Sequence, residues 1–284
     1  MDVGIGLPTT IAGVESRQVV DWAQRAEAAG FSSLGTIDRI VYGNWEPLIA
    51  LAAAATVTSR IKLVTSILIL PLRPNAALLA KQAATLQKLS NGRLVLGLAV
   101  GNREDDFDAA GVDLEGRGAR FERQLDEITS IWDGADKGFA GPIGPTSSPP
   151  PSIIIGGSSP RPFRRAAKYD GWIMGGGSPD QFAERLEQVR AAWREAGRDG
   201  SPRVLALAYF SLGDDAPQRA DAYLKDYYAF TGEAAAQIAA GALTTPEAVR
   251  ERIDGFAAAG CDELVLFPSS PDPDQVDLLA EAAL

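Results

Sequence analysis

Two glycine clusters are the residues best suited to binding an anion. They are Gly156-Gly157-Ser158-Ser159 and Gly175-Gly176-Gly177-Ser178. Each follows a short apolar run and leads into a segment with helical spacing, so glycine lets backbone N–H groups approach an anion at a helix N-terminus. Arg161, Arg164 and Arg165 follow the first cluster and could neutralise the charge. The clusters predict a phosphate site, although tight turns between strand and helix use the same residues.

Polar residues also follow two earlier apolar runs. Asp38 and Arg39 end the second run, and Gly101 and Asn102 end the fourth. The Asp38 carboxylate could accept a hydrogen bond from a ring or a substrate hydroxyl, with Arg39 as its ionic partner. A local salt bridge without a catalytic role fits the pair equally well. The acidic residues that follow, in the segment 103–106, favour a solvated loop over a lid.

The third apolar run is longer than one strand needs. It extends from Thr65 through Ser66 and Ile67 to Pro74. An apolar ledge beside a phosphate site suits a flat ring such as an isoalloxazine. The spacing alone favours the simpler interpretation of a buried strand that runs into a loop.

Several classes of chemistry are excluded by residues that the chain lacks. The sequence has no histidine and a single cysteine, Cys261. Ser-His-Asp triads, histidine metal sites and disulfides are therefore absent, and we expect no metal centre. No lysine follows a predicted strand, which disfavours Schiff-base catalysis. Cys261 is expected to be a small buried hydrophobic residue.

The net charge and the hydropathy of the chain limit the classes of partner that the protein can bind. The net charge is −10, from 27 Lys+Arg and 37 Asp+Glu, and a nucleic-acid binder needs a basic surface instead. The most apolar stretch, 61–72, is interrupted by Lys62 and Pro71 and is too short to span a bilayer. The first residues lack the basic start of a signal peptide. We expect a cytoplasmic protein that binds a small molecule and neither nucleic acid nor membrane.

The order of the elements indicates the fold class. Short apolar runs begin near residues 3, 33, 61, 93, 152, 171, 204 and 263, and helical spacing follows each of them. Eight such units in 284 residues predict a single α/β domain, a (β/α)8 TIM barrel over 1–284. An irregular excursion at about 134–151 and a helical insertion at about 216–242 interrupt it. A doubly wound sheet is the alternative, but the first run, Gly4-Ile5-Gly6-Leu7-Pro8, lacks its third glycine.

The chain resembles the luciferase-like flavin- or coenzyme F420-dependent oxidoreductases along nearly its whole length. The most characteristic block is Leu89-Ser90-Asn91-Gly92-Arg93-Leu94-Val95-Leu96-Gly97-Leu98. Val3–Pro8, Asp38, Thr65–Leu68 and the segment from Ile154 through Gly157 to Trp172 also fit. These motifs are specific for the family and unspecific for the substrate.

The resemblance implies a cofactor at the barrel mouth, with its phosphate on the loops at Gly156-Gly157-Ser158 and Gly175-Gly176-Gly177. It implies a cis peptide at Ser66–Ile67 beneath the ring. Residues matching Asp38 contact the cofactor, and Gly101 and Asn102 lie beside it. Two departures are informative, because Arg39 stands where many relatives have histidine, and Asn102 where sugar-phosphate dehydrogenases have glutamate. A proton donor must then be Asp38, Tyr42, Glu46, Glu104 or the substrate.

We expect hydride transfer between coenzyme F420 and a small organic substrate, with Asp38, Arg39 and Asn102 as the catalytic candidates. The arginines beside the first glycine cluster favour F420, because its tail carries carboxylates beyond the phosphate. One alternative is an FMN-dependent monooxygenase that uses oxygen. Another is a non-catalytic cofactor-binding relative, because histidine is missing. The family also suggests a homodimer, formed through the helices expected at 46–58 and 75–89.

Overall fold

A computed structural model describes all residues, 1–284. Its strands are β1 (Asp2–Gly6), β2 (Ser33–Thr36), β3 (Lys62–Thr65), β4 (Leu68–Ile69), β5 (Leu94–Ala99), β6 (Ser152–Gly156), β7 (Gly171–Met174), β8 (Arg203–Phe210) and β9 (Glu263–Pro268). The α-helices are α1 (Ser16–Ala29), α2 (Pro47–Val57), α3 (Ala76–Leu89), α4 (Glu104–Ala109), α5 (Arg117–Trp132), α6 (Pro160–Ala166), α7 (Pro179–Glu195), α8 (Ala216–Tyr227), α9 (Ala234–Ala240), α10 (Pro246–Ala258) and α11 (Asp274–Ala283). Two 3-10 helices, η1 (Leu70–Leu72) and η2 (Ala229–Thr231), complete the chain.

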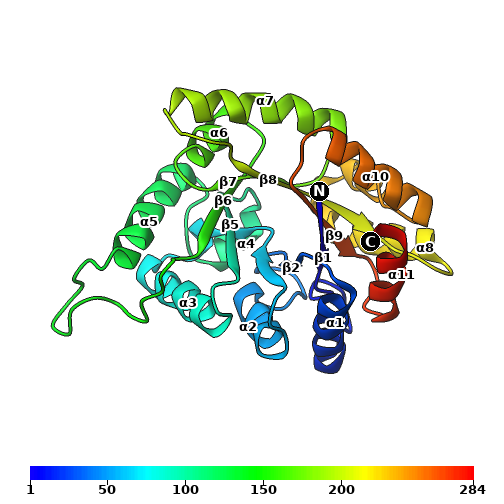
Figure 1. Ribbon diagram of the computed structural model, residues 1–284, viewed down its shortest axis with the longest axis horizontal. Helices are drawn as coiled ribbons and strands as arrows, with labels where there is room; N and C mark the ends of the chain where they lie inside the picture. The colour runs from blue at the N-terminus through cyan, green and yellow to red at the C-terminus, as the bar shows by residue number, and fades with distance from the viewer.

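The strands form one closed parallel barrel. β1 pairs with both β2 and β9, and the pairing of β3 with β5 closes the ring on the other side. Figure 1 shows the strands at the centre, with α1, α2, α3, α5, α7, α10 and α11 arranged around them. The predicted TIM barrel is confirmed, and a doubly wound open sheet is excluded because the pairing of β3 with β5 closes the sheet on itself.

Burial on both faces explains the nearly continuous apolar strands. Val64, Val95, Ile154, Ile173 and Leu205 fill the barrel interior. A larger apolar layer between strands and helices includes Trp22, Trp172 and Phe182, and Cys261 is buried in it as expected. The helices α3, α7 and α10 begin at Asn75, Ser178 and Thr245, whose side chains each accept a hydrogen bond from a backbone N–H of the first turn.

The third strand differs from the sequence prediction. A continuous strand was expected over 61–70, but β3 and β4 are separated at Ser66–Ile67, where the peptide bond is cis as the family resemblance implies. The Thr65 hydroxyl donates to the Gly97 carbonyl (2.7 Å) in place of a regular ladder bond. A Cβ on Gly97 would lie 2.0 Å from the Thr65 carbonyl oxygen, so only glycine permits this approach.

Charged side chains tie the elements together at the amino-terminal end of the strands. Arg93 donates to the carbonyls of Ser90, Ile61, Ala55 and Thr58. The characteristic Asn91-Gly92-Arg93 block therefore stabilises the base of the barrel, far from the strand ends where barrel enzymes place their active sites.

Glu27 likewise connects two elements at this end of the barrel, α1 and the segment before β3. Its carboxylate accepts hydrogen bonds from the backbone amides of Ser59, Arg60 and Ile61. Burial alone would raise the pKa of Glu27, but the three amide donors outweigh it and lower that pKa to about 2.

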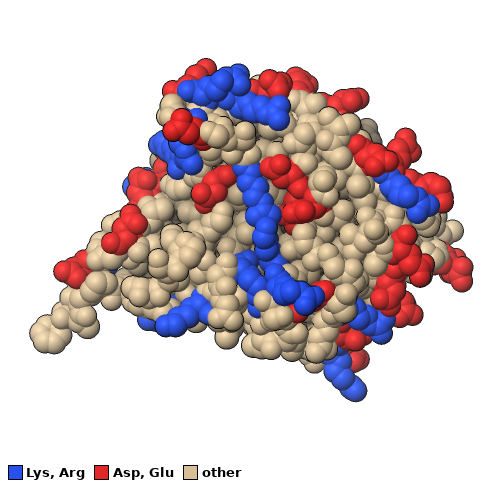
Figure 2. All heavy atoms as spheres, viewed as in Figure 1, with Lys and Arg blue, Asp and Glu red and all other residues tan.

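Two segments depart from the regular barrel. Residues 134–151 form an irregular loop that projects at the left of Figure 1. α8, η2 and α9 occupy the region expected as a helical insertion. No helix combines the length and the apolar character that a bilayer crossing requires. Figure 2 shows acidic side chains gathered on the side of α8, α10 and α11, and a line of basic side chains across the middle of the same face.

Candidate active site

A cavity of about 350 Å³ lies at the carboxyl ends of the strands. Its polar lining comes from strand ends and the loops after them: Asp38, Ser66, Gly101, Asn102, Arg103, Asp106 and Gly175. Its apolar and aromatic lining includes Ile37, Ile67, Ile69, Leu72, Phe107, Leu207, Tyr209, Tyr227, Tyr228 and Phe230. The volume falls in the range of small-molecule sites, about 300–1,000 Å³.

The break in the third strand forms one side of this cavity. Ser66 is 2% exposed, and its hydroxyl oxygen has no hydrogen-bond partner in the protein. Ile67 packs above Gly156, where a Cβ would lie 3.2 Å from the isoleucine methyl group. A buried hydroxyl without a partner is costly, so Ser66 is available to a ligand in the cavity.

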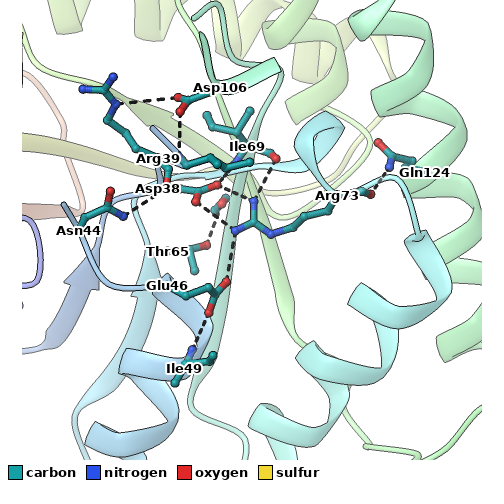
Figure 3. A network of polar contacts seen from close by, with 12 residues as sticks. Asp38, Arg39, Asn44, Glu46, Ile49, Thr65, Ile69, Arg73, Asp106 and Gln124 are labelled. Carbon is teal, nitrogen blue, oxygen red and sulfur yellow. Dashed lines mark hydrogen bonds and ion pairs between the residues drawn. The ribbon is translucent and has the colours of Figure 1, made fainter. Parts of the chain in front are cut away.

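Asp38 is held by a different arginine from the one predicted. Arg73 donates to both Asp38 oxygens, at 2.6 and 3.0 Å, and the Ile69 amide donates to Oδ2 at 2.7 Å. Arg73 also pairs with Glu46 at 3.2 Å, as Figure 3 shows. Burial opposes the charge on Arg73, but both carboxylates outweigh it and raise its pKa. Asp38 is therefore a positioned acceptor, with its oxygens already used.

The prediction that Asp38 forms an ion pair with Arg39 is wrong. The Arg39 guanidinium instead lies 3.3 Å from Asp105 and 3.9 Å from Asp106, and its side chain is 6% exposed. Asp106 also accepts from the amides of Ile40 and Val41. Aromatic rings of the insertion cover Arg39 from the other side, so it does not line the cavity.

The segment 103–106 is not a solvated loop. Glu104–Ala109 forms α4, with Asp106 and Phe107 buried. The acidic side chains of its first turn lie at the positive end of the helix dipole, and Asp106 is also attracted to the Arg39 guanidinium. Both interactions stabilise α4. As a result Arg103 and Asp106 face the cavity, while Glu104 remains exposed.

Tyrosines form the opposite wall, and sequence analysis did not identify them. Tyr209 from β8, and Tyr227 and Tyr228 from the end of α8, line the cavity. The hydroxyls of Tyr209 and Tyr228 are 2.7 Å apart. Burial raises the pKa of all three, so they remain protonated at neutral pH. Tyr42, considered as a proton donor, instead donates to Asp226 at 2.6 Å and lies outside the cavity.

A second cavity, of about 480 Å³, shares Gly175, Leu207, Tyr209 and Tyr228 with the first. It runs past Gly176, Gly177 and Ser178 to α9 and α10. A Cβ on Gly175 or Gly176 would meet nothing within 4 Å, so these backbone groups face open space. Arg252 of α10 lines the same cavity, with no carboxylate within ion-pair distance. Burial lowers the pKa of Arg252.

Unlike the second glycine cluster, the first one does not border either cavity at the barrel mouth. Gly156, Gly157 and Ser158 line neither cavity. A Cβ on Gly157 would lie 2.5 Å from Pro162, and its carbonyl accepts the indole N–H of Trp172 at 2.7 Å. These residues close the strand onto α6, which is the turn function that sequence analysis weighed against phosphate binding.

The arginines after that cluster lie outside both cavities. Arg165 pairs with Glu122 at 2.8 Å and stacks over Phe121. Arg161 and Arg164 are exposed on α6, outside both cavities. These three arginines therefore give no support to F420 over FMN.

The two cavities fit a flat ring with an anionic chain. The orphaned Ser66 hydroxyl and the aromatic wall suit a ring in the first cavity. The open glycine backbone and Arg252 suit an anion in the second. Figure 3 shows Arg73 held between Asp38 and Glu46, the residue that caps α2.

Comparison with known proteins identifies the family. The family model described as luciferase-like monooxygenase matches residues 1–267. The chain belongs to this family. An uncharacterized protein of Mycobacterium tuberculosis (strain ATCC 25618 / H37Rv) is 32% identical over 223 residues, covering 67% of this chain and 77% of its own. A phthiodiolone/phenolphthiodiolone dimycocerosates ketoreductase of Mycobacterium sp. (strain JLS) is 33% identical over 170 residues, covering 54% and 44% respectively.

Solved structures of luciferase-like enzymes share the fold. An F420-dependent secondary alcohol dehydrogenase in complex with an F420-acetone adduct has a TM-score of 0.81 at 18% identity, over 99% of this chain and 97% of its own. A type II Baeyer-Villiger monooxygenase component of Pseudomonas putida in complex with FMN has a TM-score of 0.74 at 18% identity, over 100% and 99%. The relationship supports an oxidoreductase or monooxygenase enzyme.

Proposed function

We propose that this luciferase-like protein transfers hydride between coenzyme F420 and a small organic substrate. The observation that carries the proposal is that the two cavities are neighbours, with Gly175 and Tyr228 lining both. A cofactor whose chain continues beyond its first phosphate needs such neighbouring spaces for ring and chain, and F420 has that chain. An F420-dependent alcohol dehydrogenase is also among the structures with the same fold.

Each residue of the site has a defined part in this proposal. Ser66 and Ile67 carry the ring, and the Gly175-Gly176-Gly177 loop with Arg252 binds the anionic chain. Asp38, fixed by Arg73, holds the Ile69 amide beside the ring. Gly101 and Asn102 border the substrate side of the cavity. When bound, the deazaflavin supplies the hydride chemistry.

In this proposal, tyrosines donate the proton that a histidine donates in many members of the family. The Tyr209–Tyr228 hydroxyl pair retains one O–H after its mutual hydrogen bond. Because burial keeps both hydroxyls protonated, that O–H can donate to the substrate oxygen. Glu46 and Glu104, which were alternatives, lie outside the cavity.

A fluorescence titration tests the proposal. The protein is titrated separately with F420 and FMN, and oxygen consumption is followed with each cofactor. Tight F420 binding without oxygen consumption supports hydride transfer. Exclusive FMN binding with oxygen consumption supports a monooxygenase, and binding without turnover of any alcohol or ketone supports a non-catalytic carrier; either contradicts the proposal.

We also propose that the protein forms a homodimer through α2 and α3. Ile49 and Leu78 on this face are 72% and 52% exposed, and a groove of about 840 Å³ runs between the helices. Light scattering is expected to give a dimer for the native chain and a monomer for the Ile49→Glu, Leu78→Glu double variant. A monomeric native chain would contradict this proposal.

A further inference from the structure

The charged side chains that line the first cavity are not equally neutralised. Asp38 faces Arg73 at 2.6 Å, and Asp106 faces Arg39 and two backbone amides. Arg103 has no carboxylate within ion-pair distance, although it lines the same cavity. A ligand entering this space therefore meets one guanidinium that has no carboxylate partner.

Aromatic rings fix the position of Arg103. Its guanidinium carbon lies 4.0 Å from the centroid of Phe230 and 5.1 Å from that of Tyr227. Rings over the face of a guanidinium leave its edge N–H groups for hydrogen bonding, and these suit the two oxygens of a carboxylate. Arg39 provides the contrast within the same aromatic cluster, because Asp105 and Asp106 already occupy it.

We propose that Arg103 binds a carboxylate of the substrate, so that the enzyme acts on small organic acids with an apolar or aromatic body. This inference rests on the proposed function and names its substrate class. The acid group would lie against Arg103, and the apolar body against Phe230 and Tyr227. The oxygen to be reduced would then lie toward Tyr228.

The overall charge of the protein makes the inference testable. A net charge of −10 repels anions at long range, so any preference for an acid over its neutral analogue must come from a local group. Arg252 cannot supply it in the first cavity, because it lines only the second.

Calorimetry with matched ligands tests the assignment. Benzoylformate and benzoylformamide have nearly the same shape and differ in charge, and each is titrated into protein loaded with F420 and into unloaded protein. We expect the acid to bind about tenfold more tightly than the amide, which corresponds to about 1.4 kcal/mol. Arg103→Gln is expected to bring the two affinities together, and Arg103→Lys to restore part of the difference.

Controls separate this inference from the proposed function. Arg17→Gln removes the same charge from the exposed side of α1 and should leave the preference unchanged. Equal affinity of the native protein for acid and amide would overturn the inference. Loss of F420 affinity in Arg103→Gln, without loss of the acid preference, would also overturn it by assigning Arg103 to the cofactor. Failure of F420 to bind the native protein would count against the proposed function alone, because the unloaded titration still measures the acid preference.

Discussion

The two ends of the barrel use their charged side chains differently. At the amino-terminal end, Glu27 and Arg93 are bonded to several backbone groups each, and the fully buried Glu263 pairs with Arg203. At the carboxyl end, Arg103 and Arg252 have no carboxylate partner. The first arrangement stabilises the fold, and the second leaves groups for a ligand. Substitutions at the two ends should therefore separate stability from binding.

Glu263→Gln is expected to cause the largest loss of stability. It leaves Arg203 without its ionic partner, and breaking a buried pair costs about 3–5 kcal/mol. Ser32 also donates to Glu263 at 2.6 Å, so the polar cluster is disturbed further. Urea unfolding measures the loss, and cofactor affinity of the folded protein should not change. Glu122→Gln, which removes the exposed partner of Arg165, is the control, with an expected loss below about 1 kcal/mol.

Two glycine substitutions test the contrast between the two loops. Gly157→Ala places a methyl group 2.5 Å from Pro162, so we expect about 1–3 kcal/mol of lost stability from overpacking and unchanged cofactor affinity. Gly176→Ala meets no atom within 4 Å and adds only the strain of a positive φ, about 1–2 kcal/mol. Cofactor affinity should fall markedly in Gly176→Ala. Thermal unfolding measures the stability of both variants, and titration measures their cofactor affinity. The reverse pattern would indicate that the phosphate binds at the first loop.

Ser66→Ala is expected to weaken cofactor binding without destabilising the protein. Its hydroxyl has no partner, so removing it costs the fold nothing, whereas a lost hydrogen bond to a ligand costs about 0.5–1.5 kcal/mol, up to about tenfold in affinity. Ser33→Ala is the matched control, because that hydroxyl is also buried without a partner but lies outside the cavity. Similar affinities in both variants would exclude Ser66 from the binding site.

Glu27 gives the smallest expected effect and a defined pH dependence. Its pKa is lowered from the reference value of 4.5 to about 2, so its contribution is present above pH 4.5 and is lost as the pH falls toward 2. Because Glu27 is only partly buried and solvent screens its charge, we expect about 1 kcal/mol. Urea unfolding of Glu27→Gln should differ from the native protein at pH 7 and converge with it near pH 2. A constant difference across that range would contradict this assignment.

The barrel is predictable from sequence because short apolar runs alternate along the chain with segments of helical spacing. The broken third strand is expected only through the family resemblance, since the residue types at 65–70 do not by themselves mark a break between Ser66 and Ile67. Arg73 as the partner of Asp38 is not predictable, because the two are joined only when η1 brings the chain back to β2. Tyr227 and Tyr228 lie in an insertion, whose position depends on packing against β8 and not on local spacing.

A crystal structure of the protein with F420 tests the central claim most directly. The account predicts the deazaflavin ring against Ser66 and Ile67, with its phosphate at Gly175-Gly176-Gly177 and its tail directed toward Arg252. A ring located elsewhere, or a phosphate at Gly156-Gly157-Ser158, would contradict it.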